Sequence, residues 1–389
     1  MSERELIEGA LNQVDRAQVD PALPDRHLFP GYEILCEIHR GGQGVVYQAL
    51  QIATKRRVAV KVLHEGPFAG STGRARFDRE IQILGQLHHP SIVQIHDSGV
   101  TESGHCYYVM DYISGRTLDA HIQQYAPALN DRLRLFHRVC DAVNAAHLRG
   151  VIHRDLKPSN IRVTAGGDPV LVDFGLARIA IPDFTDDETP QPMTITGQFV
   201  GSLPWASPEQ AEGSGTGIDL RTDVYSLGVI LYRLLTGRFP YKVIGSMREV
   251  MDNIVRAEPE RPSTVSRDID DEVETIVLKA LCKDPDRRYQ SAGELARDLD
   301  RYFKGEPISA KSDSGWYVMR KTLRRYRVQA AVAFAFVALL AAGAAVSTFL
   351  LLRTRDAEHA LETQLAHTRE ARDQAERTRD AGLDLVGSL

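Results

Sequence analysis

The chain has 389 residues, of which 25% are charged and 43% hydrophobic, a composition that excludes wholesale disorder. Its formal net charge of −5 at pH 7 excludes nucleic acid as a partner of the chain as a whole. The four cysteines lie far apart and form no C-x-x-C pair, which excludes a disulfide framework and a zinc module.

The first third of the sequence predicts a leader and then a small region rich in strands. Residues 2–19 place apolar side chains on one face of a short helix, which either docks on the main domain or is a loosely ordered leader. Three prolines separate it from position 31. Strand-like runs follow at 32–37, 45–51, 57–63, 92–97 and 106–111, with one helical stretch at 73–87.

From about residue 115 to residue 303, helical patterns dominate the sequence. A small sheet-rich lobe followed by a larger helical lobe makes an α+β architecture. The seam between two such lobes is a natural cleft for a ligand.

Residues 330–352 contain no charged side chain and are long enough, at about 34 Å as a helix, to cross a bilayer. Five positive charges stand at 320–327 and only two directly after the span, at Arg353 and Arg355. Positive charge marks the cytoplasmic side, so we expect a single-pass protein of the cell (plasma or inner) membrane, in contact with lipid, with residues 1–329 in the cytoplasm.

The 37 residues after the span are too few to bury a core of their own. They alternate acidic and basic side chains, which predicts a solvated helix or a weak coiled coil. Small residues in the span would permit a homodimer, although alanine-rich spans also occur singly.

A glycine-rich turn in the small lobe has the features of a phosphate-binding loop. Gly41, Gly42 and Gly44 allow backbone N–H groups to approach phosphate oxygens. Lys61 ends the apolar run Val-Ala-Val and needs an anionic partner, which phosphate would supply. Glu80, in the next helical stretch, has the context to pair with Lys61. The alternatives are a plain hairpin for the glycines and a solvated face for Glu80.

A second cluster of motifs is more specific. His-Arg-Asp-Leu-Lys-Pro-Ser-Asn at 153–160 places a carboxylate, an ammonium and an amide in one short loop, and Asp-Phe-Gly follows an apolar strand at 173–175. With the glycine loop, Val-Ala-Val-Lys and Ser-Pro-Glu at 207–209, these motifs stand in the order typical of the protein kinase family. The sequence therefore resembles that family over residues 31–303.

The resemblance implies a bilobal protein-kinase fold and the use of ATP and Mg²⁺. It assigns Asp155 to the proton of the substrate hydroxyl and Lys157 to the transferred phosphoryl group, and it assigns Asn160 and Asp173 to the metal. The residues that it places around ATP are Ile38, Gly41, Gly44, Val46, Ala59, Lys61, Glu80, Met110, Asp111 and Ile113.

Further residues of the family pattern have structural roles. The resemblance implies that Asp223 anchors the catalytic loop and that Glu209 pairs with Arg288. Each of these three is better explained by structure than by chemistry.

The resemblance is strongest to bacterial membrane-anchored Ser/Thr kinases, which implies protein substrates. Lys157 stands two residues after the catalytic aspartate, which is the Ser/Thr form of this loop, and residues 173–209 contain no tyrosine. Met-Thr-Ile-Thr at 193–196 matches activation-loop phosphosites, so we expect autophosphorylation of Thr194 and Thr196, with Arg154 as their partner.

Three positions depart from the family pattern. His39 replaces the first loop glycine, Arg162 stands where an apolar residue usually lies beneath adenine, and Trp205 replaces a tyrosine. Arg162 either stacks on the base or makes the floor of the site less apolar. The competing interpretation of the whole chain is a nucleotide-binding pseudokinase scaffold at the membrane. Lys61, Asp155 and Asp173 are all present, which favours catalysis.

The organisation expected from the sequence has five parts. They are a leader helix and linker (1–30), a kinase domain (31–303, with lobes 31–113 and 114–303), a basic juxtamembrane linker (304–329), a transmembrane helix (330–352) and a charged helical tail outside the cytoplasm (353–389).

Overall fold

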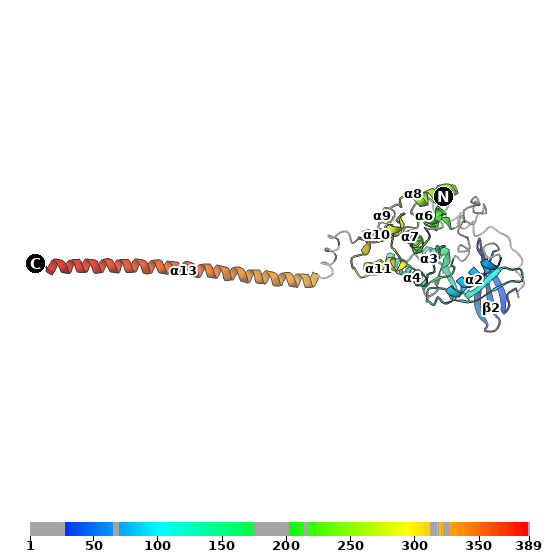
Figure 1. Ribbon diagram of the computed structural model, residues 1–389, viewed down its shortest axis with the longest axis horizontal. Helices are drawn as coiled ribbons and strands as arrows, with labels where there is room; N and C mark the ends of the chain where they lie inside the picture. The colour runs from blue at the N-terminus through cyan, green and yellow to red at the C-terminus, as the bar shows by residue number, and fades with distance from the viewer. Residues whose placement is uncertain are drawn as a thin grey trace. The chain divides into compact units, whose positions relative to one another are not determined.

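The computed structural model describes residues 28–64, 70–174, 202–213, 217–311 and 327–387, together with 317, 319 and 321. The chain divides into two compact units, Met1–Tyr317 and Val318–Leu389. Figure 1 shows the first unit as a small sheet with one helix beside a larger group of helices.

The small lobe is a five-stranded antiparallel sheet in the order β1-β2-β3-β5-β4, accompanied by helix α2. Its elements are β1 (Tyr32–Gly41), β2 (Gly44–Gln51), β3 (Arg56–Leu63), α2 (Gly70–Gly85), β4 (Ile95–Val100) and β5 (Cys106–Asp111). β3 is rich in β-branched residues and buries both faces, as expected of a central strand.

The two faces of this sheet belong to different clusters of buried side chains. Val58 and Val60 of β3 pack on the outer face with Phe29 and Tyr107, whereas Ala59 and Leu63 join the main core that continues into the large lobe. Successive residues of a strand point to opposite faces of the sheet. Lys61 stands two residues after Ala59, so its side chain is on the same face and points to the large lobe.

Two boundaries in the small lobe differ from the prediction. Phe29 is 1% exposed and its ring lies 4.8 Å from that of Tyr107, so the domain begins before the predicted residue 31. The fourth strand is three residues later than predicted, because Ile92 instead makes a parallel bridge with Leu171 of the large lobe.

The large lobe is helical, with a second, three-stranded sheet at the lobe boundary in the order β6-β7-β8. These strands are β6 (Gly115–Thr117), β7 (Ile161–Thr164) and β8 (Pro169–Leu171). The helices are α3 (Leu118–Tyr125), α4 (Leu129–His147), α6 (Pro208–Ala211), α7 (Leu220–Thr236), α8 (Met247–Arg256), α9 (Pro262–Val265), α10 (Asp271–Ala280) and α11 (Ala292–Phe303). Short 3₁₀ turns are η1 (Pro158–Asn160), η2 (Leu203–Trp205), η4 (Pro285–Arg287) and η5 (Ser309–Lys311).

Helix α7 forms the centre of this lobe. It is buried nearly all round and packs against α4, α10 and α11. Gly228 allows the close contact with α10, since a Cβ there would lie 2.9 Å from Cβ of Ala280. Gly237 ends the helix in the left-handed conformation, at φ 71°, which favours glycine.

The domain also ends later than the predicted residue 303. Ile308 is 1% exposed, and the buried carboxylate of Asp298 in α11 accepts backbone N–H bonds from Ser309 and Ala310. Burial raises the pKa of Asp298, but these bonds and Arg301 outweigh it and lower the pKa below its usual value. Residues 304–311 are therefore part of the large lobe and not of a linker.

The second unit consists of one continuous helix, α13 (Arg327–Gly387), over most of its described length. Its segment Ala331–Ala375 contains an apolar window, with a mean hydropathy of 2.3, that makes the helix long and apolar enough to cross a membrane. The predicted span and the predicted helical tail are thus parts of the same helix.

Candidate active site

The catalytic loop brings three of the predicted residues within hydrogen-bond distance. Lys157 Nζ lies 3.1 Å from Asp155 Oδ2, and Asn160 Nδ2 donates to the Asp155 carbonyl oxygen at 2.9 Å and to Oδ2 at 3.3 Å. Asp155 and Asn160 are each 6% exposed. A carboxylate, an ammonium and an amide therefore meet at one site, where the carboxylate and the amide are buried and the ammonium is partly exposed.

Asp223, at the start of α7, fixes the backbone that carries these groups. Its fully buried carboxylate accepts the N–H groups of His153 and Arg154, at 2.7 and 2.9 Å, and it lies 2.9 Å from His147 Nε2. Arg154 has φ 63°, a strained conformation for a non-glycine residue, which these bonds hold in place. The predicted contact between Asp223 and the catalytic loop is present.

His153 lies buried under the same loop. Burial lowers the pKa of its imidazole more than the surrounding carboxylates raise it. Its Nδ1 accepts the Asp155 N–H at 3.4 Å, and its ring lies 4.8 Å from that of Phe174. His153 thereby connects the catalytic loop to the Asp-Phe-Gly motif.

Lys61 extends from β3 to the large lobe and contacts Asp173. Its Nζ lies 2.5 and 2.6 Å from the two carboxylate oxygens of Asp173 and 3.3 Å from Oε1 of Gln43. The expected pair with Glu80 is therefore not the one formed among the described residues. An ammonium that is 3% exposed needs an anion, and in this structure the carboxylate of Asp173 meets that need.

A backbone hydrogen bond joins Val172, the residue before Asp173, to the catalytic loop. Val172 N–H donates to the Asn160 carbonyl oxygen at 3.0 Å. The two predicted metal ligands therefore come from adjacent, mutually bonded segments.

The apolar residues predicted around adenine belong to one cluster. Ala59 and Met110 are buried and paired across β3 and β5, and Ile38, Val46 and Ile113 are partly buried against the same core. The Asp111 N–H donates to the Gln94 carbonyl oxygen at 3.0 Å, and its carboxylate contacts His96 at 2.7 Å and Arg56.

The glycines of the predicted phosphate loop differ in what they require. Gly44 has φ 154°, and a Cβ there would lie 1.9 Å from the Val62 carbonyl oxygen, so the approach of β2 to β3 demands glycine. At Gly41 the nearest atom to a Cβ would be Nε2 of His39, at 3.1 Å. His39 itself is exposed.

Arg162 and Trp205, two of the departures from the family pattern, have their own partners. Arg162 Nη1 donates to the Gly115 carbonyl oxygen at 3.2 Å, so its position is explained without a stacked base. Trp205 is 5% exposed and packs edge-on against Phe239 at 4.9 Å, in the core of the large lobe.

Glu209 and Arg288 form the predicted buried pair, with contacts of 2.8 and 2.9 Å. Burial raises the pKa of Glu209, but the hydrogen bonds and charge of Arg288 outweigh it and lower the pKa. This pair fixes α6 against the loop that precedes α11.

The donor set fits a magnesium nucleotide better than a metal held by protein alone. Asp173 and Asn160 provide hard oxygen donors of the kind that Mg²⁺ prefers. Within the described residues no cluster of three or more His, Cys, Asp or Glu side chains could hold a metal. A metal at this site would therefore take its remaining ligands from phosphate and water.

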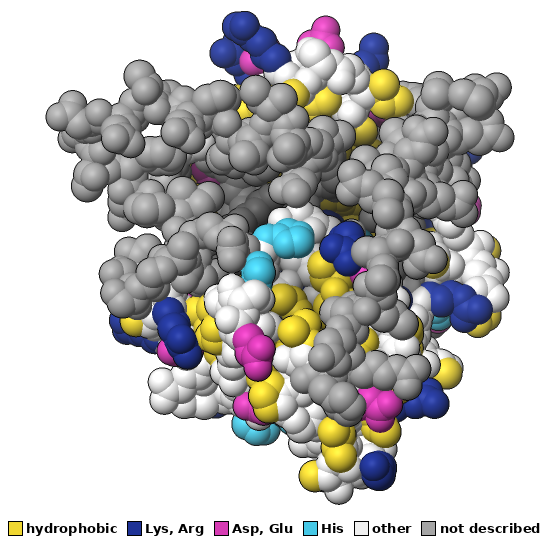
Figure 2. Space-filling model, turned by 90° about the vertical axis from the view of Figure 1, so that its right-hand side faces the viewer, with side chains coloured by type: hydrophobic (Ala, Val, Ile, Leu, Met, Phe, Trp, Pro, Cys, Tyr) yellow, Lys and Arg dark blue, Asp and Glu magenta, His cyan; other side chains and the backbone are white. Residues whose placement is uncertain are grey.

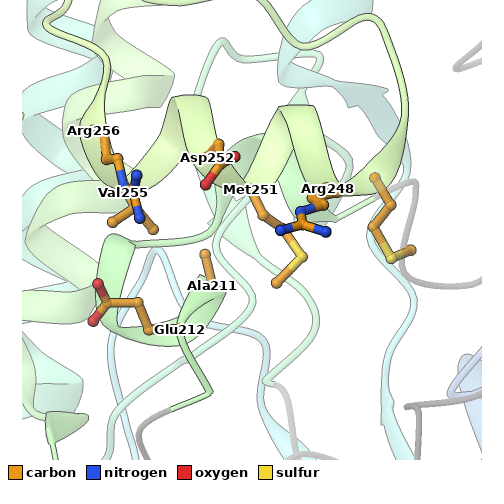
Figure 3. A pocket seen from close by; sticks show the side chains of 8 residues that line it. Ala211, Glu212, Arg248, Met251, Asp252, Val255 and Arg256 are labelled. Carbon is orange, nitrogen blue, oxygen red and sulfur yellow. The ribbon is translucent and has the colours of Figure 1, made fainter.

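A separate hollow of about 510 Å³ lies between α6 and α8 (Figure 3). None of the predicted catalytic or nucleotide residues lines it; its lining is Ala211, Glu212, Met247, Arg248, Met251, Asp252, Val255 and Arg256. On the face shown in Figure 2, basic side chains are scattered among acidic and hydrophobic ones and form no single basic patch among the described residues.

Two buried groups at the site were not found from the sequence. Tyr108 donates to Asp173, and His147 contacts Asp223. Both lie in apolar stretches and carry no motif, so only the tertiary contact reveals them. The predicted phosphosites Thr194 and Thr196 lie outside the described residues.

Comparisons with known proteins agree with this geometry. The sequence model described as protein kinase domain matches residues 32–298. The chain is 37% identical over 294 residues to a probable serine/threonine-protein kinase, SCO3848, of Streptomyces coelicolor, covering 75% of this chain and 42% of that protein. It is 38% identical over 288 residues to the serine/threonine-protein kinase PknB of Mycobacterium tuberculosis, covering 73% and 45%.

Among solved structures, the PknI kinase domain of Mycobacterium tuberculosis superposes with a TM-score of 0.56 at 26% identity, covering 73% of this chain and all of that one. The predicted bilobal kinase fold is confirmed. The chain spans less than half the length of the curated relatives named above. On the family match, which covers more than half of its residues, the chain belongs to the protein kinase family.

Proposed function

We propose that the chain is an ATP-dependent Ser/Thr protein kinase whose catalytic aspartate is Asp155. The observation that carries the proposal is that Lys157 and Asn160 both lie within 3.3 Å of Asp155, and that Asn160 is bonded to the segment of Asp173. Its relatives are named serine/threonine-protein kinases, which supports the same acceptor type.

Each of these residues has a distinct task in the proposed reaction. The Asp155 carboxylate accepts and orients the proton of the acceptor hydroxyl, and the adjacent Lys157 ammonium neutralises negative charge on the transferred group. Asn160 and Asp173 hold Mg²⁺, and Lys61 holds the phosphates of ATP. The bound metal nucleotide supplies the phosphoryl group and neutralises part of its charge.

Lys157 also connects the catalytic loop to the segment that follows the predicted phosphosites Thr194 and Thr196. Besides its contact with Asp155, Lys157 Nζ donates a hydrogen bond to the Ser202 hydroxyl oxygen at 2.9 Å. We propose that phosphorylation of Thr194 and Thr196 acts on this segment by adding charge for Arg154 to bind.

We further propose that the chain is a single-pass membrane protein with its kinase domain in the cytoplasm. Support comes from the apolar segment of α13, whose side chains are exposed throughout 331–352, as lipid contact would require. The positive charges of 320–327 set the orientation.

The part of α13 beyond the span supports pairing with a second copy of the chain. Seven uncharged residues with alternating three- and four-residue spacing form a stripe along a segment rich in charged side chains, at Thr354, Ala357, Leu361, Gln364, Thr368, Ala371 and Ala375. The Thr354 and Thr368 hydroxyls bond to carbonyl oxygens of their own helix, so they need no water. In a parallel pair of helices, Arg353 of one copy would lie opposite Glu358 of the other copy, and the two side chains carry opposite charges.

A phosphotransfer assay tests the proposed activity. The full chain is placed in lipid vesicles in which its kinase domain is accessible to added ATP. It is then incubated with labelled ATP, Mg²⁺ and a generic protein acceptor. We expect label on serine and threonine, and on Thr194 and Thr196 of the chain itself by phosphopeptide mapping. Nucleotide binding with no transfer to any acceptor would instead establish the pseudokinase scaffold.

A further inference from the structure

The hydroxyl of Tyr108 contacts the carboxylate that we assign to the metal. Tyr108 lies in β5, directly opposite Lys61 in the register of β3 and β5, and is 2% exposed. Its hydroxyl donates to Oδ1 of Asp173 at 3.3 Å. Paired residues on neighbouring strands point to the same face of a sheet, so Lys61 and Tyr108 approach Asp173 together.

The two contacts to Asp173 differ in what they can do during the reaction. Lys61 contacts both carboxylate oxygens, so it must give up part of this contact in order to reach a nucleotide phosphate. Tyr108 contacts Oδ1 alone and leaves Oδ2 free of its own bond. A rigid aromatic side chain packed in the core keeps its hydroxyl in place while a lysine ammonium moves.

The hydroxyl is also suited to remain a donor. A buried hydroxyl without a partner is costly, so the geometry favours the bond to Asp173.

We propose that Tyr108 is a positioning residue that holds the Asp173 carboxylate in its metal-binding orientation while Lys61 turns to the nucleotide. This inference rests on the proposed role of Asp173 as a Mg²⁺ ligand. It predicts that removal of the Tyr108 hydroxyl weakens the binding of Mg²⁺ and leaves the binding of the nucleotide base unchanged.

The test compares Tyr108→Phe with Tyr107→Phe in the full chain. Tyr107 is the adjacent residue of β5, is 6% exposed and packs on the opposite face against Phe29, so it controls for the loss of a hydroxyl from this strand. For each variant, thermal unfolding is recorded with ADP alone and with ADP over a range of Mg²⁺ concentrations, and phosphotransfer is titrated with Mg²⁺ in parallel.

For Tyr108→Phe we expect the Mg²⁺ concentration for half-maximal stabilisation to rise about tenfold, which corresponds to about 1.4 kcal/mol. The Mg²⁺ concentration for half-maximal rate rises by the same factor, kcat at saturating Mg²⁺ stays within about threefold, and Tyr107→Phe behaves as wild type. An unchanged Mg²⁺ dependence in Tyr108→Phe overturns the inference.

A third variant separates this inference from the proposed function. Asp173→Asn is expected to lose the Mg²⁺-dependent stabilisation. If it loses that stabilisation while Tyr108→Phe keeps the wild-type Mg²⁺ dependence, only the role of Tyr108 fails. If Asp173→Asn keeps the stabilisation, the assignment of Asp173 and the inference both fail.

Discussion

Lys61 Nζ and the Asp173 carboxylate are joined by two contacts, of 2.5 and 2.6 Å, although the residues are 112 positions apart in the sequence. The contact connects the sheet of the small lobe to the Asp-Phe-Gly motif of the large lobe. It is made by a lysine that is almost fully buried, so the ammonium has an anionic partner before any phosphate arrives.

Replacement of Lys61 by methionine removes this ammonium but keeps the length of the side chain. We expect kcat/KM for ATP to fall by about 100-fold or more, because an ammonium directed at the phosphates is lost. The circular dichroism spectrum should remain that of the wild type, since methionine suits an apolar strand. Retention of most of the activity would contradict the assignment of Lys61.

Replacement of Asp155 by asparagine should separate binding from transfer. The carboxylate acts on the acceptor hydroxyl, so we expect the transfer rate to fall by about 10²–10⁴-fold. Nucleotide affinity, measured by calorimetry with ADP and Mg²⁺, should change by less than about twofold. A variant that binds nucleotide and still transfers phosphate at a wild-type rate would show that another group is the base.

The catalytic loop could be predicted because its chemistry is local. Asp155, Lys157 and Asn160 stand within six positions, so a short loop brings them together without long-range information. The anchor Asp223 and the pair Glu209–Arg288 were predicted from the family pattern, and their contacts are present.

The partner of Lys61 could not be predicted in the same way. Two carboxylates, Glu80 and Asp173, are candidates for one ammonium, and the choice depends on how the lobes and α2 are placed. Tyr108 illustrates the same limit, because strand alternation gives its face but not its register against β3. Trp205 was known from the sequence only as a departure from the family's tyrosine, and its large apolar ring packs in the core of the large lobe.

The buried pair Glu209–Arg288 predicts a large effect on stability. Arg288→Ala leaves the buried Glu209 carboxylate without its cation and should lower the free energy of unfolding by about 3–5 kcal/mol. The control is Arg297→Ala, which removes an exposed contact of 3.9 Å to Glu294 and should cost less than about 1 kcal/mol. Denaturant unfolding of the full chain in detergent measures both. Equal losses would contradict this prediction.

Lys283 predicts a specific dependence of stability on pH. Burial lowers the pKa of its ammonium to about 8, although it donates to the Tyr225 hydroxyl and the Ile254 carbonyl oxygen. Between about pH 8 and the ordinary lysine value of 10.5, the unfolded chain holds this proton and the folded chain does not. The free energy of unfolding therefore rises with pH in this window, by at most about 1.4 kcal/mol per unit.

Comparison with Lys283→Met isolates this contribution from those of other groups. The wild type should gain stability relative to the variant as pH rises from 8 to 10, and the difference should be constant below pH 8. The same substitution at the exposed Lys242 is the control. A difference between wild type and Lys283→Met that is flat across this window would show that the burial of Lys283 carries no pH dependence.

The uncharged stripe of α13 predicts where two copies of the chain meet. In a parallel pair the stripe faces the partner, so a cysteine at Ala371 should form an intermolecular disulfide under mild oxidation. Ala366 lies on the same helix but off the stripe, which makes Ala366→Cys a matched control. Both substitutions are made in a Cys36→Ser background, because Cys36 is an exposed thiol of the kinase domain.

The measurement is the fraction of covalent dimer in lipid vesicles at several ratios of protein to lipid. We expect Ala371→Cys to cross-link several times faster than Ala366→Cys, and we expect this ratio to persist on dilution with lipid, because a specific interface does not depend on random collisions. Pairing in the bilayer also raises the effective concentration of one kinase domain near another. Autophosphorylation of the wild-type chain should therefore be faster in vesicles than in dilute detergent. Equal cross-linking at the two positions would show that the tails meet without a defined face, and would remove the stripe as the cause of any dimer.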